Sequence, residues 1–94
     1  MKENLLLEKS LHFAGRIMKL HKFLTSKKEG IISKQIVRSG TSIGANINEG
    51  NYGSSRADFV CKMQIAQKEC AETEYWIRLA HLSSILMKKS FKVY

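Results

Sequence analysis

The chain has 94 residues, of which 44% are hydrophobic and 26% are charged, and it contains no proline. These values exclude a disordered chain and predict one helical domain over residues 1–94, with a thin core that self-association could extend. The formal net charge of +8 favours a polyanionic partner such as nucleic acid or an anionic membrane surface, although charge that merely solvates a small domain is equally compatible with it.

The compartment follows from the cysteines and from the hydropathy. Cys61 and Cys70 are nine residues apart, which turns them to opposite faces of one helix and prevents a disulfide within it. No run of about 18 apolar residues could span a membrane, and the charges near the N-terminus do not fit a signal peptide. We therefore expect a reduced, cytoplasmic protein that does not insert into a membrane.

A first helix is predicted from Asn4 to about Leu24, because apolar residues recur there at helical spacing. The opposite face carries cationic residues at spacings of three and four, which places them within about 80° on a helical wheel. This basic ridge consists of Lys9, His12, Arg16 and Lys19.

The segment "TSKKEG" predicts a break in the chain. Ser26 and Glu29 have the spacing of a capping box for one short turn, which Gly30 would end. Ser33 would then cap a second helix over about 34–49, with Gly50 in the left-handed conformation just past its end.

Glycines and polar residues mark the second helix. Gly40 and Gly44 lie one turn apart beside an isoleucine face that includes Ile43 and Ile47, and two interior glycines cost about 2 kcal/mol relative to alanine. We expect close approach by a neighbouring helix to offset this cost. A second stripe could be a solvated face or a hydrogen-bonded network at a helix or subunit interface, and it contains Gln35, Arg38, Ser42, Asn46 and Glu49.

A third helix of about 27 residues is predicted to open at Ser55, with Asp58 three residues later completing a capping box. At 1.5 Å per residue it is about 40 Å long, too long for the second helix to cover. The apolar remainder, which we expect to mark an oligomer interface, is Ile77, Leu79, Leu82, Ile85 and Leu86. The following "ILMKKSFKVY" resembles the start of a fourth segment.

Two motifs, "QIVRSGTSIGANINEG" and "ADFVCKMQIAQKECAETEYWIRLA", resemble those of a four-helix-bundle family first noticed as reading frames in intervening sequences of 23S ribosomal RNA genes. Accessory variability proteins of diversity-generating retroelements are its relatives. The resemblance covers roughly residues 5–82. It implies an antiparallel up-and-down four-helix bundle in a ring-like homo-oligomer, often of five subunits, with a positively charged surface. In the retroelement relatives it implies binding of nucleic acid and of a reverse transcriptase partner.

The resemblance is carried by individual positions of this chain. On the second helix they are Arg38, Ser42, Ile43, Asn46, Ile47, Glu49 and Gly50. On the third helix they are Asp58, Phe59, Ala66, Glu69, Glu72, Tyr75 and Trp76. The chain departs from the family pattern in two ways: no proline precedes the second helix, and the final helix is short or missing before Tyr94.

Catalytic and metal sites are not indicated. A di-metal bundle site needs Glu-x-x-His pairs on two helices, and neither Glu69 nor Glu72 has a histidine at that offset. No histidine stands at a local spacing that would activate either cysteine, and we expect burial of Cys70. We therefore expect no enzyme activity, metal or cofactor.

The sequence supports a non-enzymatic, oligomeric accessory protein that binds RNA or structured nucleic acid through its backbone. The alternative is an assembly module whose charge serves only solubility, and a membrane-surface helix is weaker because the bundle needs its apolar stripe. The candidate phosphate-binding residues are Lys9, Arg16, Lys19, Lys22, Lys27, Lys28 and Lys34.

Overall fold

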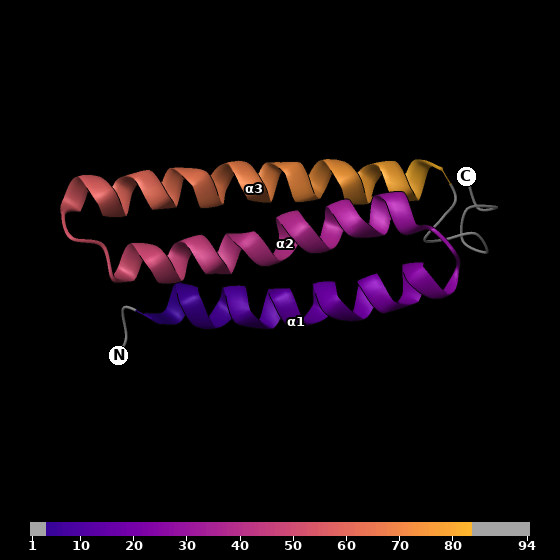
Figure 1. The fold of residues 1–94 in the computed structure, drawn as a ribbon, viewed down its shortest axis with the longest axis horizontal. Helices are drawn as coiled ribbons and strands as arrows, with labels where there is room; N and C mark the ends of the chain where they lie inside the picture. The colour runs from indigo at the N-terminus through magenta and orange to yellow at the C-terminus, as the bar shows by residue number, and fades with distance from the viewer. Residues whose placement is uncertain (1–3, 84–94) are drawn as a thin grey trace.

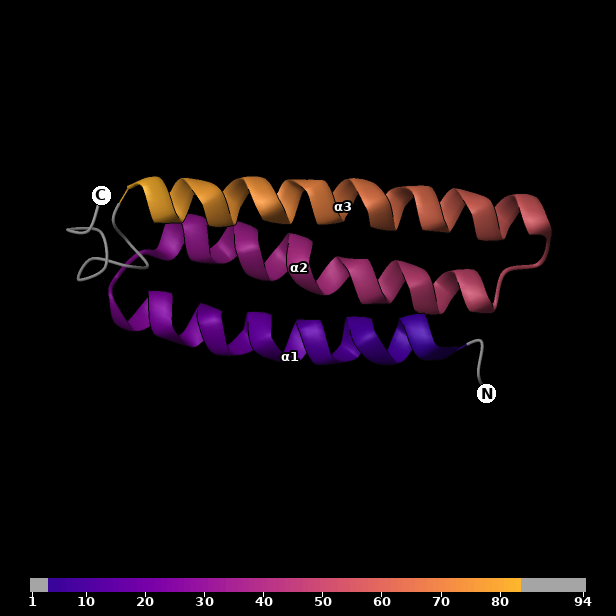
Figure 2. The same cartoon turned by 180° about the vertical axis from the view of Figure 1, so that it is seen from behind.

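The computed structural model describes residues 4–83, which form three antiparallel helices: α1 (Leu5–Ser26), α2 (Gly30–Asn51) and α3 (Arg56–Leu82). The helices make a rod of 49 × 23 × 21 Å, with the α1–α2 turn at one end and the α2–α3 loop at the other (Figure 1). The view from behind shows the same order, with α2 lying between α1 and α3 (Figure 2).

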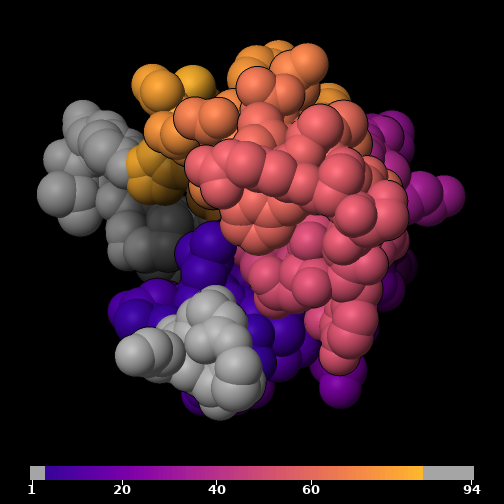
Figure 3. Space-filling view, turned by 90° about the vertical axis from the view of Figure 1, so that its left-hand side faces the viewer, coloured from indigo at the N-terminus to yellow at the C-terminus, as the bar shows by residue number. Residues whose placement is uncertain are grey.

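The all-α class is confirmed, but the expected four-helix bundle is wrong for this structure, which has three helices over the described residues. Most of the predicted fourth segment, including Ile85 and Leu86, lies outside those residues. Helix α2 packs against both of its neighbours and is the central element of the bundle. An end-on view shows the α2–α3 loop end and the start of α1 (Figure 3).

The core lies in the half of the rod nearer the α1–α2 turn. Its centre consists of Ile17 and Leu24 from α1 and Ile36 from α2, all nearly inaccessible to solvent. The half-buried side chains around this centre are Phe13, Leu20, Ile32, Val37, Trp76 and Ile77. The same half of the bundle therefore supports the turn that carries the lysines.

The end of α1 differs from the prediction. The helix continues to Ser26, and Lys28 takes the left-handed conformation with a φ of 63°. The Lys28 N–H donates to the Thr25 carbonyl at 2.9 Å and the Glu29 N–H donates to the Leu24 carbonyl at 3.0 Å. These two bonds make a Schellman C-cap, which closes α1 without a glycine.

Four predictions about helix ends were wrong. Ser26 ends α1 and donates its hydroxyl to the Phe23 carbonyl at 2.6 Å, so it forms no capping box with Glu29. Gly30 begins α2 instead of ending a turn, and Ser33 lies inside that helix. Ser33 is buried, and its hydroxyl is satisfied there because it contacts His21 Nδ1 at 2.5 Å and donates to the His21 carbonyl at 3.3 Å. Gly50 is still helical because α2 continues to Asn51. It therefore does not take the left-handed conformation, and none of the glycines has a positive φ.

The start of α3 confirms the predicted cap. Ser55 has an extended backbone, and its hydroxyl accepts a hydrogen bond from the Asp58 N–H at 3.1 Å. The Asp58 carboxylate in turn accepts from the Ser54 N–H at 3.3 Å, which also places a negative charge at the positive end of the helix dipole.

Candidate nucleic-acid interface

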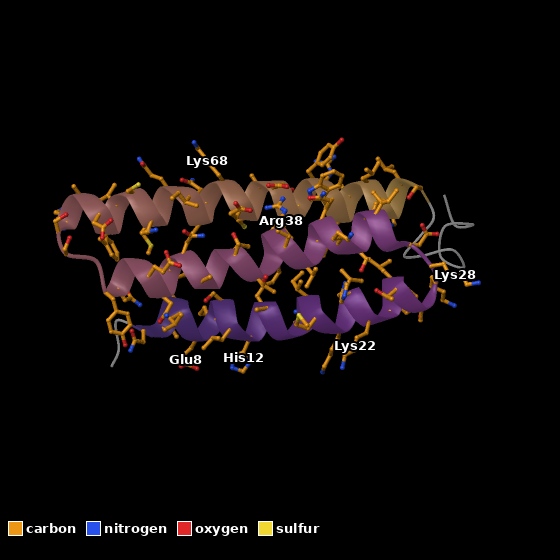
Figure 4. The ribbon with its side chains drawn as sticks, in the orientation of Figure 1. Glu8, His12, Lys22, Lys28, Arg38 and Lys68 are labelled. Atoms are coloured by element: carbon orange, nitrogen blue, oxygen red, sulfur yellow. The ribbon has the colours of Figure 1, made fainter. Side chains whose placement is uncertain are left out.

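The basic ridge of α1 lies on the face turned away from α2. Ser10, Ile17 and Leu24 are the buried positions of α1, and they fix the opposite face toward solvent. All four ridge residues are exposed there: Lys9, His12, Arg16 and Lys19. In Figure 4, His12 points away from the other two helices, as does Lys22 near the end of α1.

Further cations lie at the end of the rod that carries the α1–α2 turn: Lys27 and Lys28 in the turn itself, Lys22 near the end of α1 and Lys34 near the start of α2. Lys22, Lys27, Lys28 and Lys34 are all exposed, and Lys28 lies at the tip of the molecule (Figure 4). Lys27 Nζ stands 5.6 Å from the centre of the Phe23 ring. Cations at the C-terminus of α1 also interact favourably with the negative end of its dipole.

Some cationic side chains of the described residues form ion pairs with carboxylates, and others do not. Across residues 4–83 the ion pairs are Arg38 with Glu69 and Glu72, and Lys62 with Glu49 at 2.8 Å. None of the seven candidate phosphate-binding residues forms an ion pair with a described residue. Among the described residues, the cations of the α1 ridge and of the turn outnumber the nearby carboxylates, Glu8 and Glu29, with which they form no ion pair, and this excess raises the local potential for a polyanion.

Lys62 is one of the cations that form an ion pair. Its hydrogen bond to the Glu49 carboxylate, reinforced by the charge of Glu49 and more weakly by Asp58, raises the pKa of the Lys62 ammonium above its ordinary value of 10.5. This pair links α2 to α3 near their connecting loop, so the role of Glu49 here is an interhelical contact within the chain.

The polar stripe of α2 makes contacts with α3. The Arg38 guanidinium donates to Glu72 and, at 3.5 Å, to Glu69, while the Gln35 side-chain oxygen accepts from Arg38 at 3.2 and 3.3 Å. The Trp76 indole N–H donates to the same Glu72 carboxylate at 3.0 Å. Of the two alternatives, a solvated face or a hydrogen-bonded network at an interface, this part of the stripe therefore forms a network between neighbouring helices.

The remaining stripe residues are used within the helix. Asn46 donates to the Ser42 carbonyl at 2.8 Å, while the Ser42 hydroxyl is buried without a partner among the described residues.

Two aromatic residues of α3 that carry the resemblance are exposed. Tyr75 is 60% exposed and meets the Trp76 ring edge-to-face at 5.1 Å. Phe59 is 39% exposed near the start of α3.

Gly40, Gly44 and Gly50 of α2 face the neighbouring helices. A Cβ at Gly40 would lie 2.9 Å from Ile17 of α1, and one at Gly44 would lie 2.9 Å from the Ser10 hydroxyl. At Gly50 a Cβ would lie 2.9 Å from the terminal methyl of Met63 on α3. Ile47 is buried and Ile43 is half-buried between these contacts.

Two expectations about the third helix need correction. Cys70 is exposed, as is Cys61, so its predicted burial is wrong. Ile77 packs against the core, whereas Leu82 is 70% exposed. The apolar remainder predicted on α3 is therefore only partly free.

Sequence reasoning missed two features. Phe23, which is 42% exposed, lies among the cations of α1, and its position four residues after Lys19 was the available signal. A buried pair of hydroxyls also joins the centres of α2 and α3, with 2.8 Å between Ser39 Oγ and Thr73 Oγ1. Nothing in the sequence marks these two residues as partners.

Comparisons with known proteins decide the family. The sequence matches the 23S rRNA-intervening sequence protein family over residues 2–94. The chain belongs to this family. It is also similar to a crystal structure at 1.70 Å of a Bacteroides thetaiotaomicron protein of unknown function from the S23 ribosomal protein family, with 49% identity and a TM-score of 0.87. That similarity covers 95% of this chain and 83% of the other. No curated protein matches.

The described helices offer neither a metal site nor a membrane span. Among residues 4–83, no group of three or more His, Cys, Asp or Glu side chains is placed to hold a metal ion. None of the three described helices combines the length and apolar character needed to cross a membrane.

Proposed function

We propose that this member of the 23S rRNA-intervening sequence protein family is a non-enzymatic, homo-oligomeric accessory protein that binds nucleic acid through its basic surface. The observation that carries the proposal is the excess of positive charge on α1, in the α1–α2 turn and at the start of α2. Seven exposed cations lie there, and none is paired with a described carboxylate. Lysine and arginine side chains in this setting bind phosphates without reading sequence, so shape or a partner would supply specificity.

Binding through phosphates predicts strong salt dependence. Each phosphate contact releases counterions, so the logarithm of the affinity falls with the logarithm of the salt concentration by about 0.7 to 0.9 per contact. Fluorescence anisotropy with labelled RNA should therefore show binding at 50 mM salt that weakens steeply toward 200 mM. Absence of binding at the lower salt concentration, or affinity indifferent to salt, would refute the proposal.

Matched variants locate the surface. Replacing Lys19 and Lys22 by glutamine removes two cations from the candidate interface, whereas replacing Arg56 and Lys68 removes two exposed cations from α3. Lys68 points away from α1 on the opposite side of the bundle (Figure 4). The first variant should lose roughly 1.4 to 1.8 from the salt slope, and the second should keep it. Equal effects would mean that only net charge matters.

The homo-oligomeric part of the proposal rests on exposed apolar side chains. Leu6, Leu11 and Met18 of α1 are 53%, 55% and 43% exposed, and Leu82 of α3 is 70% exposed. Exposed apolar area on a small protein favours association.

The same side chains favour the alternative function, an assembly module that presents its ring to another protein, such as a reverse transcriptase-type partner. A pull-down with that class of protein, using a variant with charge reversal at Lys9, Arg16 and Lys19, separates the two functions. If the module is the function, the variant still captures the partner. Partner capture without nucleic-acid binding in the native protein would favour the module.

A further inference from the structure

An aromatic residue lies within the basic stripe of α1. Positions 5, 9, 12, 16, 19 and 23 are separated by four or three residues, so they follow one line along the helix, and all six side chains are exposed. The line spans about 27 Å at 1.5 Å per residue. It ends at Phe23, one helical turn before Lys27.

Phe23 is poorly explained as a core residue. Its ring is 42% exposed, whereas Phe13 and Leu20 of the same helix pack against the core. One contact of the ring is with the Lys27 ammonium, 5.6 Å from the ring centre, which shows that a cation is already within reach of it. A planar apolar surface thus lies beside flexible positive charges.

Exposed aromatic rings among lysine and arginine side chains are the means by which proteins hold single-stranded nucleic acid. Phosphates contact the cations, while an unpaired base stacks on the ring. A base within a duplex is already stacked between its neighbours, so it gains nothing from the ring.

We infer that the α1 stripe binds single-stranded nucleic acid, with an unpaired base stacked on Phe23 and adjacent phosphates held by Arg16, Lys19 and Lys27. This inference rests on the proposed nucleic-acid-binding function and adds to it the class of ligand and a specific stacking residue. The charge of the stripe favours this occupant over a second copy of the chain, since two copies of a cationic stripe repel each other.

The test compares a single-stranded oligonucleotide containing 2-aminopurine with a blunt duplex of the same length. Base stacking contributes about 1 to 3 kcal/mol per base, so Phe23→Leu should weaken single-strand binding roughly five- to 150-fold and leave duplex binding nearly unchanged. Phe23→Trp should restore single-strand affinity and quench the 2-aminopurine fluorescence. Tyr52→Leu is the matched control, because Tyr52 is 84% exposed at the opposite end of the rod.

The outcomes separate the inference from the proposed function. If Phe23→Leu weakens single-strand and duplex binding equally, or neither of them, the stacking role is wrong while salt-dependent binding stands. If the native protein binds neither oligonucleotide at low salt, both proposals fail. If Phe23→Leu instead lowers the mass in light scattering and leaves binding unchanged, the ring belongs to a contact between copies. Circular dichroism confirms that each variant is folded.

Discussion

Gly44 lets α1 and α2 approach closely, because its missing side chain leaves room for Ser10. We expect Gly44→Leu to lower the free energy of unfolding by about 1 to 3 kcal/mol or more, since the added atoms overfill a contact that has no free space. Urea unfolding followed by circular dichroism measures the change. An unchanged midpoint would contradict the close approach of the two helices.

Gly15 offers the matched control, because nothing lies within 4 Å of a Cβ built at that position of α1. At a site without packing contacts, the effect of a substitution depends on intrinsic helix propensity, which is higher for alanine than for glycine. Gly15→Ala should therefore raise the free energy of unfolding by about 1 kcal/mol. The same urea experiment measures it. A loss of stability would show that the exposed face of α1 is covered in solution by another copy.

The Lys62 ammonium should titrate above its ordinary pKa of 10.5, because the Glu49 carboxylate stabilises its charged form. A cation whose pKa is raised by folding contributes stability below its unfolded pKa and loses that contribution as the pH rises through the folded value. Glu49→Gln should therefore lower the Lys62 pKa toward 10.5, as measured by NMR of the lysine side-chain carbons. An unchanged titration would mean that the pair is not formed in solution.

At the scale of the helices, the hydroxyls of Ser39 and Thr73 provide a polar contact in the buried interface of α2 and α3. Each hydroxyl also bonds a carbonyl of its own helix, Ser39 to Gln35 and Thr73 to Glu69. A double-mutant cycle with Ser39→Ala and Thr73→Val should therefore give a modest coupling of about 0.5 to 1.5 kcal/mol. Additive losses in urea unfolding would show that the two hydroxyls do not interact.

Periodicity predicted the three helices of the described residues in their order, and Ser55 and Asp58 predicted the start of α3, but the four-helix bundle that the resemblance implied is wrong. The C-terminal end of α1 and the start of α2 could not be predicted. Gly30 is a strong local signal for a helix end, yet packing overrides it, because burying Ser33 against His21 requires α2 to begin earlier. The left-handed residue is Lys28, whose type gives no such signal.

The candidate interface was more predictable than the core. Exposure of the basic ridge follows from helical spacing, because the apolar positions fix the orientation of α1. The partners of the polar stripe could not be predicted, since pairing Arg38 with Glu72 depends on the register of α2 against α3. The burial of Ser39 could not be predicted either, because a hydroxyl that bonds a carbonyl of its own helix can enter a core.

At the scale of the whole molecule, we predict that the protein associates with itself. Apolar side chains such as Leu11 and Met18 remain open to solvent on a chain of 10.7 kDa. Multi-angle light scattering should give a mass several times this value, because covering such side chains is favourable. A stable monomer at micromolar concentration would contradict the prediction.

Position 28 combines a left-handed backbone conformation, which favours glycine, with an exposed positive charge, which requires a lysine or an arginine. A left-handed conformation costs a lysine roughly 1 to 2 kcal/mol, a penalty that glycine does not carry. If the ammonium at this tip contacts a polyanion, then exchanging Lys28 for glycine would relax the corner and weaken the complex in one step. The strained backbone at Lys28 would then be retained because a lysine at this position contributes to binding.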